Sequence, residues 1–454
     1  MSKALYAGFD LGTTFFKVGL YNEHGECVGL GRRAFVKDEE PNGRCTVPVT
    51  RFLETLSAAL ADALTQAGSA PDEISGVSYC AQANTFLLLD NSDTPLTPLI
   101  VWPDQRAAPL CDSIAELTAT DQFLQRSGQG LMGAEWMLAK LDWLRKHKPD
   151  LWRRTAKILT ISDYLTMLMT GCFIGDCGTD SLTGLWDIQQ NAWNEEMTDF
   201  LELDLNKLPE LHRPGSFTVG IGAYGAEWLG IPAGTPFTIG ALDHHTAALG
   251  GGINSSTPVS VSFGTSLVCF QFMENYRPAR QSCIGPATES GCYYQISFNA
   301  PGASAMDWYR STYAPDLSFE ELIREAQSVE PGCDGLRAEI QEGAIRLRNK
   351  RAAHGHGHCA RAVMELTGRN TATLLNHLTV GQGAPASSII AVGGAARSDT
   401  WMQIVEETSG VGVVPARPAD TASKGAAMFS AVATGLYENL ETCAKRWCDT
   451  DKRT

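Results

Sequence analysis

The feature that most constrains this chain is a short glycine-threonine turn that occurs twice, once near the start of each half. In the first copy an apolar run ends in Asp10-Leu11-Gly12-Thr13-Thr14, and a second apolar run follows from Phe16 to Tyr21. In the second copy, within Pro258 to Phe272, a strand pattern leads into Ser262-Phe263-Gly264-Thr265-Ser266. Apolar runs on both sides of such a turn predict a β-hairpin. The recurrence predicts a duplicated core to which each half contributes one hairpin.

Strand and helix patterns alternate outside the two hairpins. In 50–68 apolar residues recur at three- and four-residue spacing and Gly68 follows as a stop signal, which predicts an amphipathic helix. Further strands are predicted over Ile74 to Cys80, Phe86 to Asp90 and Pro236 to Leu242. This alternation favours an α/β fold.

The length of the chain predicts two domains, because 454 residues exceed what one hydrophobic core usually organises. We place the boundary just before the glycine run at 250–252, which gives domains 1–248 and 249–454. A cleft between the two domains is then the expected place for a ligand.

Composition narrows the class of protein. A hydrophobic fraction of 44% with 19% charged residues is typical of a globular protein with a packed core. The start of the chain lacks a signal-peptide pattern, and no apolar run is long enough to span a membrane. Thirteen cysteines without a C-x-x-C pair predict reduced thiols in a cytoplasmic protein. A net charge of -15 disfavours nucleic acid as a partner.

The two turns suggest phosphate binding. Backbone N–H groups in a tight turn cradle phosphate oxygens without net positive charge, and glycine permits the close approach. Asp10 is placed to organise a hydrated Mg²⁺ on the phosphates, since Mg²⁺ prefers carboxylate and water oxygens. Lys17 is either a local cation for the phosphates or an exposed strand lysine.

A third glycine turn lies near the C-terminus. A buried strand pattern over Ile389 to Val392 enters Gly393-Gly394-Ala395-Ala396-Arg397-Ser398, and a helical run from Thr400 to Thr408 follows. A helix N-terminus behind a glycine turn lets a base or a phosphate approach the backbone. The chain has no G-x-x-x-x-G-K-[S/T] pattern, which disfavours a P-loop fold.

Asp243 is the candidate catalytic carboxylate. It follows the predicted strand Pro236 to Leu242, and ligands of open α/β sheets bind at the carboxyl ends of strands. The alternative is that Asp243 caps the helix that follows.

Taken together, the motifs resemble those of the FGGY carbohydrate kinases, and the resemblance runs over nearly the whole chain. The matching segments are Gly8-Phe9-Asp10-Leu11-Gly12-Thr13-Thr14 with Lys17, Trp102-Pro103-Asp104-Gln105-Arg106, Ser162-Asp163-Tyr164-Leu165, Gly240-Ala241-Leu242-Asp243, Phe263-Gly264-Thr265-Ser266, Gly393-Gly394-Ala395-Ala396-Arg397-Ser398 and Lys424-Gly425-Ala426-Ala427.

The resemblance implies two actin-like (ribonuclease H-like) α/β domains with a catalytic cleft between them, an N-terminal one for sugar and a C-terminal one for nucleotide. It implies ATP and Mg²⁺ as cofactors, Asp243 as general base, and Asp10 with Asp243 at the metal. The implied phosphate and adenosine contacts are Gly12, Thr13, Thr14, Lys17, Gly264, Thr265, Gly393, Gly394, Ala395 and Ser398. A homodimer is a further expectation from the family.

The implied substrate is a small sugar, and we lean towards a pentulose such as xylulose or ribulose. Its expected contacts are Gln82, Ala83, Asn84, Trp102, Asp104, Arg106 and His244, although Asp104 and Arg106 equally suit the task of tying down their loop. Xylulose-type members usually carry Gln-Met-His-Gly where this chain has Gln82-Ala83-Asn84-Thr85, and 335–358 lacks their proline-rich stretch. The alternatives are a kinase for another polyol or an aldonate, an actin-like regulatory ATPase without a sugar acceptor, and a non-catalytic sugar-binding relative.

The segment His354-Gly355-His356-Gly357-His358-Cys359 allows two interpretations. Histidine and cysteine are zinc ligands. A polar, glycine-rich loop that enters a helix over Ala360 to Leu366 is the simpler interpretation.

Overall fold

The computed structural model describes residues 4–341, 343–378, 386–417 and 420–450. Spatial contacts divide the chain into two units. The first comprises Met1–Gly250, Phe272–Gln295 and Pro418–Thr454, and the second comprises Gly251–Gln271 and Ile296–Arg417. The division predicted from sequence follows chain order at 248/249, whereas in space two later segments group with the first unit.

The main sheet of the first unit contains the strands that lead into Gly12 and Asp243. Its strand order is β14-β15-β6-β1-β2-β3, with bounds Thr218–Gly220, Pro236–Leu242, Ile74–Ala81, Leu5–Leu11, Phe15–Tyr21 and Cys27–Ala34. Strands β1 and β2 form the predicted antiparallel hairpin. Strands β1, β6 and β15 are parallel, and Leu11 and Leu242 both align with Ala81. The carboxyl ends of the three strands therefore meet at the same edge of the sheet.

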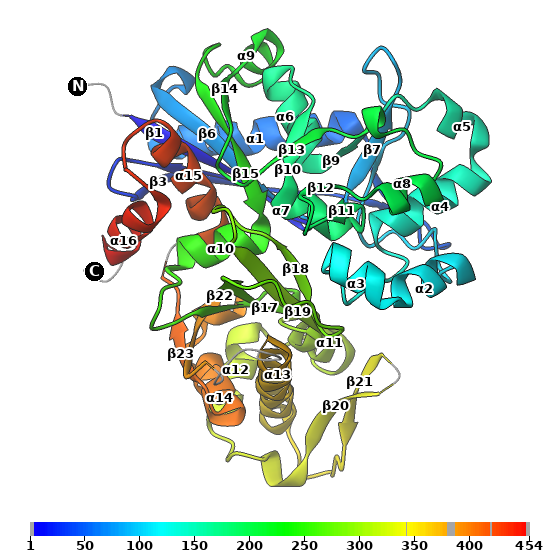
Figure 1. Ribbon diagram of the computed structural model, residues 1–454. Helices are drawn as coiled ribbons and strands as arrows, with labels where there is room; N and C mark the ends of the chain where they lie inside the picture. The colour runs from blue at the N-terminus through cyan, green and yellow to red at the C-terminus, as the bar shows by residue number, and fades with distance from the viewer. Residues whose placement is uncertain (1–3, 342, 379–385, 418–419, 451–454) are drawn as a thin grey trace. The chain divides into compact units, whose positions relative to one another are not determined.

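Helices from both ends of the chain cover this sheet. Helix α1 (Val49–Ala67) packs on β2 and β3 and ends at Gly68, whose φ of 59° is the left-handed conformation that glycine favours as a C-cap. Helix α15 (Thr421–Ala433), drawn in red in Figure 1, lies against β1, β6 and β15. The fit is close, because a Cβ on Gly8 would lie 1.8 Å from the carbonyl oxygen of Ser423. Helix α15 also contacts α10 (Asp243–Gly251), where a Cβ on Gly425 would lie 1.9 Å from the oxygen of Thr246.

A second sheet in the first unit carries the loop that contains Trp102. Its order is β4-β5-β8-β7-β9, with bounds Asp38–Glu39, Cys45–Val47, Leu99–Ile100, Phe86–Leu89 and Lys157–Thr160. Helix α4 (Met137–His147) contributes Leu138, Leu141 and Leu144 to the core beside this sheet. The other helices and strands of the first unit are α2 (Asp112–Ala119), α3 (Asp121–Ser127), α5 (Pro149–Arg154), α6 (Ile161–Thr170), β10 (Ile174–Asp176), α7 (Cys177–Asp180), β11 (Trp186–Asp187), β12 (Ala192–Trp193), α8 (Glu195–Phe200), β13 (Glu210–His212), α9 (Ala223–Leu229), β18 (Cys283–Pro286) and α16 (Leu440–Thr450).

The second unit repeats the start of the first. Strands β16 (Val259–Phe263) and β17 (Ser266–Met273) form an antiparallel hairpin, and β16 pairs in parallel with β22 (Ser388–Val392). The first unit has the same pattern in β1, β2 and β6, so the predicted duplication is confirmed. The strand order within the second unit is β19-β17-β16-β22-β23, with β19 at Tyr293–Pro301 and β23 at Gly412–Pro415.

Helices enclose a separate core in the second unit. They are α11 (Ser304–Tyr313), α12 (Phe319–Gln327), α13 (His356–Leu378) and α14 (Asp399–Ser409). Helix α13 is much longer than the helix predicted over 360–366, because its buried residues continue to Leu378. A small hairpin, β20 (Arg337–Gln341) with β21 (Ala344–Arg348), occupies the stretch that lacks the proline-rich segment. Among the described residues of either unit, the longest helices lack the apolar character needed to cross a membrane.

Three aspartates are buried in elements that contact the main sheet: Asp163 in α6, Asp176 at the end of β10 and Asp180 in α7. The hydroxyl of Tyr79 in β6 donates to Asp176 Oδ2 at 3.3 Å, and the amide of Thr179 donates to Asp176 Oδ1 at 2.7 Å. Burial raises the pKa of Asp176 to about 7, and it also raises the pKa of Asp163 and of Asp180. Because burial disfavours the charged form, and Asp163 also repels the charges of Asp176 and Asp180, the folded state favours the protonated forms.

We expect Gly8→Ala to destabilise the protein by about 3 kcal/mol, because the added methyl group meets backbone of α15 and that helix must shift. Gly355→Ala is the matched control, since a Cβ there meets open space, and its effect should stay within about 0.5 kcal/mol. Urea denaturation of the two variants measures both values. Equal midpoints for Gly8→Ala and the wild type would contradict the close packing of α15 on β1.

We expect Asp176→Asn to change how stability depends on pH. The folded-state pKa of about 7 exceeds the ordinary value of 3.8, so the contribution of Asp176 is complete below about pH 4 and is lost as the pH rises through 7. Asparagine does not titrate, so the variant should gain on the wild type by up to about 4 kcal/mol between pH 4 and 8, at about 1.4 kcal/mol per pKa unit. Denaturation at a series of pH values measures the difference, and parallel profiles would refute the shift.

Candidate active site

The first glycine-threonine turn joins β1 to β2 beside a buried ion-pair cluster. Asp10, in β1, aligns across the hairpin with Lys17 in β2. The ammonium of Lys17 lies 2.8 Å from Asp10 Oδ2 and 2.6 Å from Asp420 Oδ2. Lys17 is therefore held between two carboxylates rather than exposed on its strand, which excludes the simpler alternative for this residue.

Asp420 was not singled out from sequence. It is the N-cap of α15, where its Oδ1 accepts a hydrogen bond from the amide of Ser423 at 2.9 Å. An aspartate directly before an alanine- and serine-rich helical run is a signal for such a cap. The signal does not reveal that the other oxygen of the same carboxylate reaches Lys17, because the two residues are far apart in the chain.

The carboxylates of this edge influence one another. Burial raises the pKa of Asp10; Lys17 lowers it, and both Asp420 and Asp243 add to the rise. Burial alone would lower the pKa of Lys17, but Asp10 and Asp420 raise it. Asp243 is thus close enough to Asp10 to act on it electrostatically. Mg²⁺ is usually bound through one or two carboxylates together with water, so the carboxylates of this edge are candidate ligands for it.

Asp243 and His244 stand at the start of α10, directly after β15. Their side chains are each 27% exposed, and their closest side-chain approach is 3.9 Å, from His244 Nε2 to Asp243 Oδ1. The amide of His244 donates to the same oxygen at 2.7 Å. This bond goes to the adjacent amide rather than to one two or three positions on, so it does not support the capping alternative, and the carboxylate of Asp243 still faces solvent in part.

The predicted sugar-loop residues form one hydrogen-bonded network with the first turn. Thr13 Oγ1 accepts from the indole Nε1 of Trp102 at 2.8 Å and donates to Gln82 Oε1 at 3.3 Å. Gln82 Nε2 in turn donates to the carbonyl oxygens of Leu11 and Gly12, at 3.3 and 3.2 Å. The polar groups of Gln82 are therefore used to hold the turn in shape.

Asn84 and Asp104 are likewise engaged within the protein. Asn84 donates to the oxygen of Leu182 at 3.0 Å and accepts from the amide of Met137 at 2.8 Å. Asp104 is fully buried, and its two oxygens accept from the guanidinium of Arg106 at 2.7 and 2.9 Å and from the amide of Cys45 at 2.7 Å. This geometry favours the loop-tying interpretation of Asp104 and Arg106. Ala83, which lies between Gln82 and Asn84, is half-buried.

The second glycine-threonine turn is enclosed by two other segments of the second unit. The amide of Gly302 donates to the oxygen of Thr265 at 3.1 Å, and the amide of Ala303 donates to the oxygen of Gly264 at 2.6 Å. Gly393, whose φ is 96°, is so close that a Cβ there would lie 3.0 Å from the nitrogen of Gly264. Thr265 and Gly393 are both exposed. The two glycine turns predicted from sequence are therefore neighbours, and the start of α11 is a third neighbour that the sequence did not indicate.

The glycine turn at 393–394 does not lead directly into the helix, as the sequence had suggested. A 3₁₀ turn, Ala395–Arg397, lies between, and α14 begins only at Asp399. Ser398 is the N-cap of α14, and its hydroxyl accepts from the amide of Trp401 at 3.2 Å. Ala395 is buried in the core, whereas Gly394 is exposed. Within this motif the two glycines offer the accessible backbone.

The histidine segment has other partners. His354 Nδ1 accepts from the amide of Arg351 at 3.0 Å, His356 Nδ1 bonds the hydroxyl of Tyr309 at 2.8 Å, and His358 Nε2 lies 3.4 Å from a carboxylate oxygen of Asp334. In the part of the chain that the structure describes, no group of three or more histidine, cysteine or acidic side chains could hold a metal ion. The structure therefore gives no support to a zinc site in this segment.

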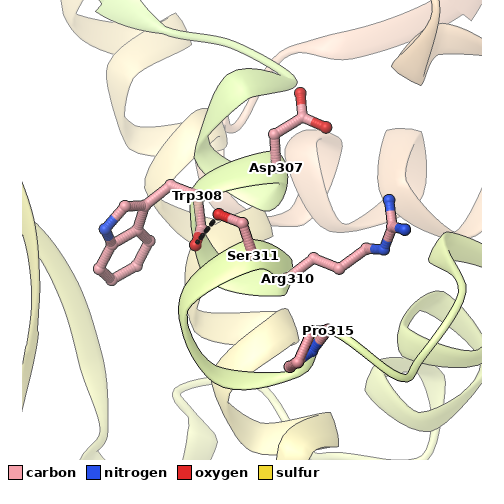
Figure 2. A pocket seen from close by; sticks show the side chains of 5 residues that line it. All are labelled: Asp307, Trp308, Arg310, Ser311 and Pro315. Atoms are coloured by element: carbon pink, nitrogen blue, oxygen red, sulfur yellow. Dashed lines mark hydrogen bonds between the residues drawn. The ribbon is translucent and has the colours of Figure 1, made fainter.

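Helix α11 bears a hollow of about 350 Å³ that is lined by Asp307, Trp308, Arg310, Ser311 and Pro315 (Figure 2). Figure 2 shows Trp308 and Arg310 pointing to opposite sides of the helix. The hydroxyl of Ser311 donates to the oxygen of Trp308 at 3.1 Å, and Arg310 Nε donates to the oxygen of Leu317. The polar groups of Arg310 and Ser311 are thus used locally, and the five lining residues include none of those predicted for the site.

Comparison with known proteins identifies the family. The family model described as the N-terminal domain of the FGGY family of carbohydrate kinases matches residues 5–250, and the model of the C-terminal domain matches residues 259–434. A xylulose kinase from Bacillus subtilis (strain 168) is 26% identical over 455 residues, which cover 97% of this chain and 90% of that protein.

Two solved structures share the fold. A ligand-bound xylulose kinase from Lactobacillus acidophilus has a TM-score of 0.87 at 21% identity, and a gluconate kinase from the same organism has a TM-score of 0.88 at 22% identity. Each comparison covers 98% of this chain and 92% of the other.

The fold and the family matches define a carbohydrate kinase, a phosphotransferase whose acceptor is a hydroxyl group of a small sugar. The chain belongs to the FGGY family of carbohydrate kinases, and the resemblance inferred from its motifs is confirmed.

Proposed function

We propose that this kinase uses ATP and Mg²⁺ to phosphorylate a pentulose, with xylulose as the first candidate. The observation that carries the proposal is the shared edge of β1, β6 and β15. This edge brings the first glycine-threonine turn and Asp243 together in one unit. The relative named xylulose kinase, matched over nearly the whole chain, favours xylulose among the sugars.

Asp10 and Asp243 are the residues that we propose for Mg²⁺. Both are carboxylates, they influence each other electrostatically, and Mg²⁺ completes its coordination with water and phosphate oxygens rather than with many protein ligands. Bound there, the ion would neutralise charge on the phosphates.

The phosphate chain would be held mainly by backbone. We propose that the N–H groups of Gly12, Thr13 and Thr14 bind phosphate oxygens in the first unit, with Lys17 as the nearby cation, and that Gly264 and Thr265 do so in the second. Gly393 and Gly394 would lie beside the adenosine, where exposed backbone without side chains permits close approach. Ala395 and Ser398 would support that turn from behind, since one is in the core and the other caps α14.

Asp243 would act on the acceptor. Its carboxylate accepts the proton of the attacking hydroxyl as the phosphoryl group is transferred in line. His244 and the indole of Trp102 would line the sugar site, with the backbone around Ala83. Gln82, Asn84, Asp104 and Arg106 would act mainly through the shape of their loops, because their polar groups already have partners.

The other functions considered from the sequence have less support. The family match does not favour a regulatory ATPase or a non-catalytic relative. A gluconate kinase shares the fold as closely as a xylulose kinase does, so the choice of sugar needs a direct test. We also propose the cytoplasm as the location, because all thirteen cysteines are free thiols. The homodimer and the cleft between the units stay predictions from the family.

A coupled assay of ADP release, run with purified protein against a panel of ketoses, polyols and aldonates, tests the substrate. We expect xylulose to give the highest kcat/KM, with turnover that depends on Mg²⁺. A higher value for gluconate or glycerol would redirect the substrate, and ADP release that does not depend on any added sugar would contradict the proposal.

We expect Asp243→Asn to lower kcat by roughly 10² to 10⁴, the usual contribution of a general base. The amide oxygen can still accept from the backbone of His244, so the fold and the affinity for ADP, measured by calorimetry, should persist. Asp112→Asn, at the exposed first position of α2, is the control and should leave kcat unchanged. Near-normal turnover in Asp243→Asn would remove this residue from the chemical step.

A further inference from the structure

A lysine is buried beneath the Trp102 loop. Lys140, on α4, is fully inaccessible to solvent, and its helix packs in the core beside the second sheet. Burial lowers the pKa of Lys140 to about 7, although Asp104 acts in the opposite direction. Placing an amine in the interior costs free energy unless its donors find partners. The contacts of Lys140 must therefore offset the cost of burying its amine.

The partners of Lys140 are two consecutive backbone carbonyls. Its Nζ donates to the oxygen of Trp102 at 2.7 Å and to the oxygen of Val101 at 3.2 Å. An amine keeps at least two N–H donors whether or not it is protonated, so both bonds survive titration of Lys140. The lysine thus holds the main chain at Trp102.

The indole continues the path to the first turn. The amide of Trp102 donates to Thr85 Oγ1 at 3.0 Å, and its Nε1 donates to Thr13 Oγ1 at 2.8 Å. Thr13 and Thr85 both donate to Gln82 Oε1, at 3.3 and 3.1 Å. A continuous series of hydrogen bonds therefore leads from the interior of α4 to the turn proposed for phosphate.

We propose that Lys140 is a positioning residue for the acceptor sugar. By holding the carbonyls of Val101 and Trp102 it sets the indole against Thr13, and so fixes the sugar-facing loop relative to the phosphate turn. The inference rests on the proposed function, which gives Trp102 its place in the sugar site. The amide of Asp104 also donates to the oxygen of Val101, at 2.9 Å, and Arg106 anchors the later part of the loop, so Lys140 acts mainly on the oxygen of Trp102.

The first test is Lys140→Met, which keeps the length of the side chain and removes its donors. We expect KM for the sugar accepted in the panel to rise about tenfold or more, because the buried carbonyl of Trp102 loses the donor Lys140 and the loop shifts, while the carbonyl of Val101 keeps the amide of Asp104. KM for ATP should change by less than about threefold, because the backbone of the turn remains. An unchanged sugar KM in a folded Lys140→Met protein would overturn the proposal.

Trp102→Phe removes only the indole donor and tests the other end of the path. It should raise the sugar KM as well, and the double variant should show little more than the larger single effect, since both changes act through one contact. Additive effects, or no effect of Trp102→Phe, would overturn the proposal. If Lys140→Met fails to fold, Lys140→Gln, which also shortens the reach to the Trp102 oxygen, is measured in its place, and an unchanged sugar KM in that variant would overturn the proposal.

Leu144→Ala is the matched control, because it removes core packing from the same helix and leaves the hydrogen bonds of Lys140 in place. This variant should have a lower unfolding temperature and an unchanged sugar KM. If its KM rose as much as that of Lys140→Met, the effect of Lys140 on KM would be one of general stability.

A second readout needs no turnover. In protein labelled with ¹⁵N-tryptophan, the indole N–H signal of Trp102, assigned by its loss in Trp102→Phe, should shift and exchange faster with water in Lys140→Met and not in Leu144→Ala. If no sugar in the panel is phosphorylated, the proposed function fails, and this signal still decides whether Lys140 positions Trp102.

Discussion

The ion pairs of Lys17 with Asp10 and Asp420 are the interaction on which the first unit depends. They join the hairpin that opens the chain to the N-cap of α15 near its end. The same helix is so close to β1 that no side chain larger than hydrogen fits at Gly8. Charge and close packing therefore act at the same interface, and they fix the strand that leads into the first glycine-threonine turn.

Local patterns predicted the secondary structure around the site, because each is encoded by adjacent residues. The hairpins at Gly12 and Gly264 and the strand before Asp243 were all found where the sequence placed them. The partners of these residues could not be predicted. Asp420 and Lys140 reach the site through the fold, and a lysine within an amphipathic helix carries no sign that it will be buried.

The roles of the polar loop residues were equally hidden. The family resemblance implied that Gln82 and Asn84 contact the sugar, and it left open whether Asp104 contacts the sugar or ties down its loop. In the structure their hydrogen bonds go to backbone groups of other segments and, for Asp104, also to the guanidinium of Arg106. Hydrogen bonds already made inside the protein keep such loops in one shape, and that order reduces the entropy lost when a substrate binds.

The position of α15 has a consequence for how the chain is made. A ribosome completes the first two hundred and more residues of the first unit long before it synthesises the helix that covers β1. Until then the glycine-bearing face of that strand lacks its cover, and Lys17 lacks one of its two carboxylates. Domains whose segments are contiguous finish folding as they emerge. In this chain the unit whose translation begins first is the last to complete its fold. A nascent chain that ends before Thr421 leaves β1 uncovered and accessible to other partners.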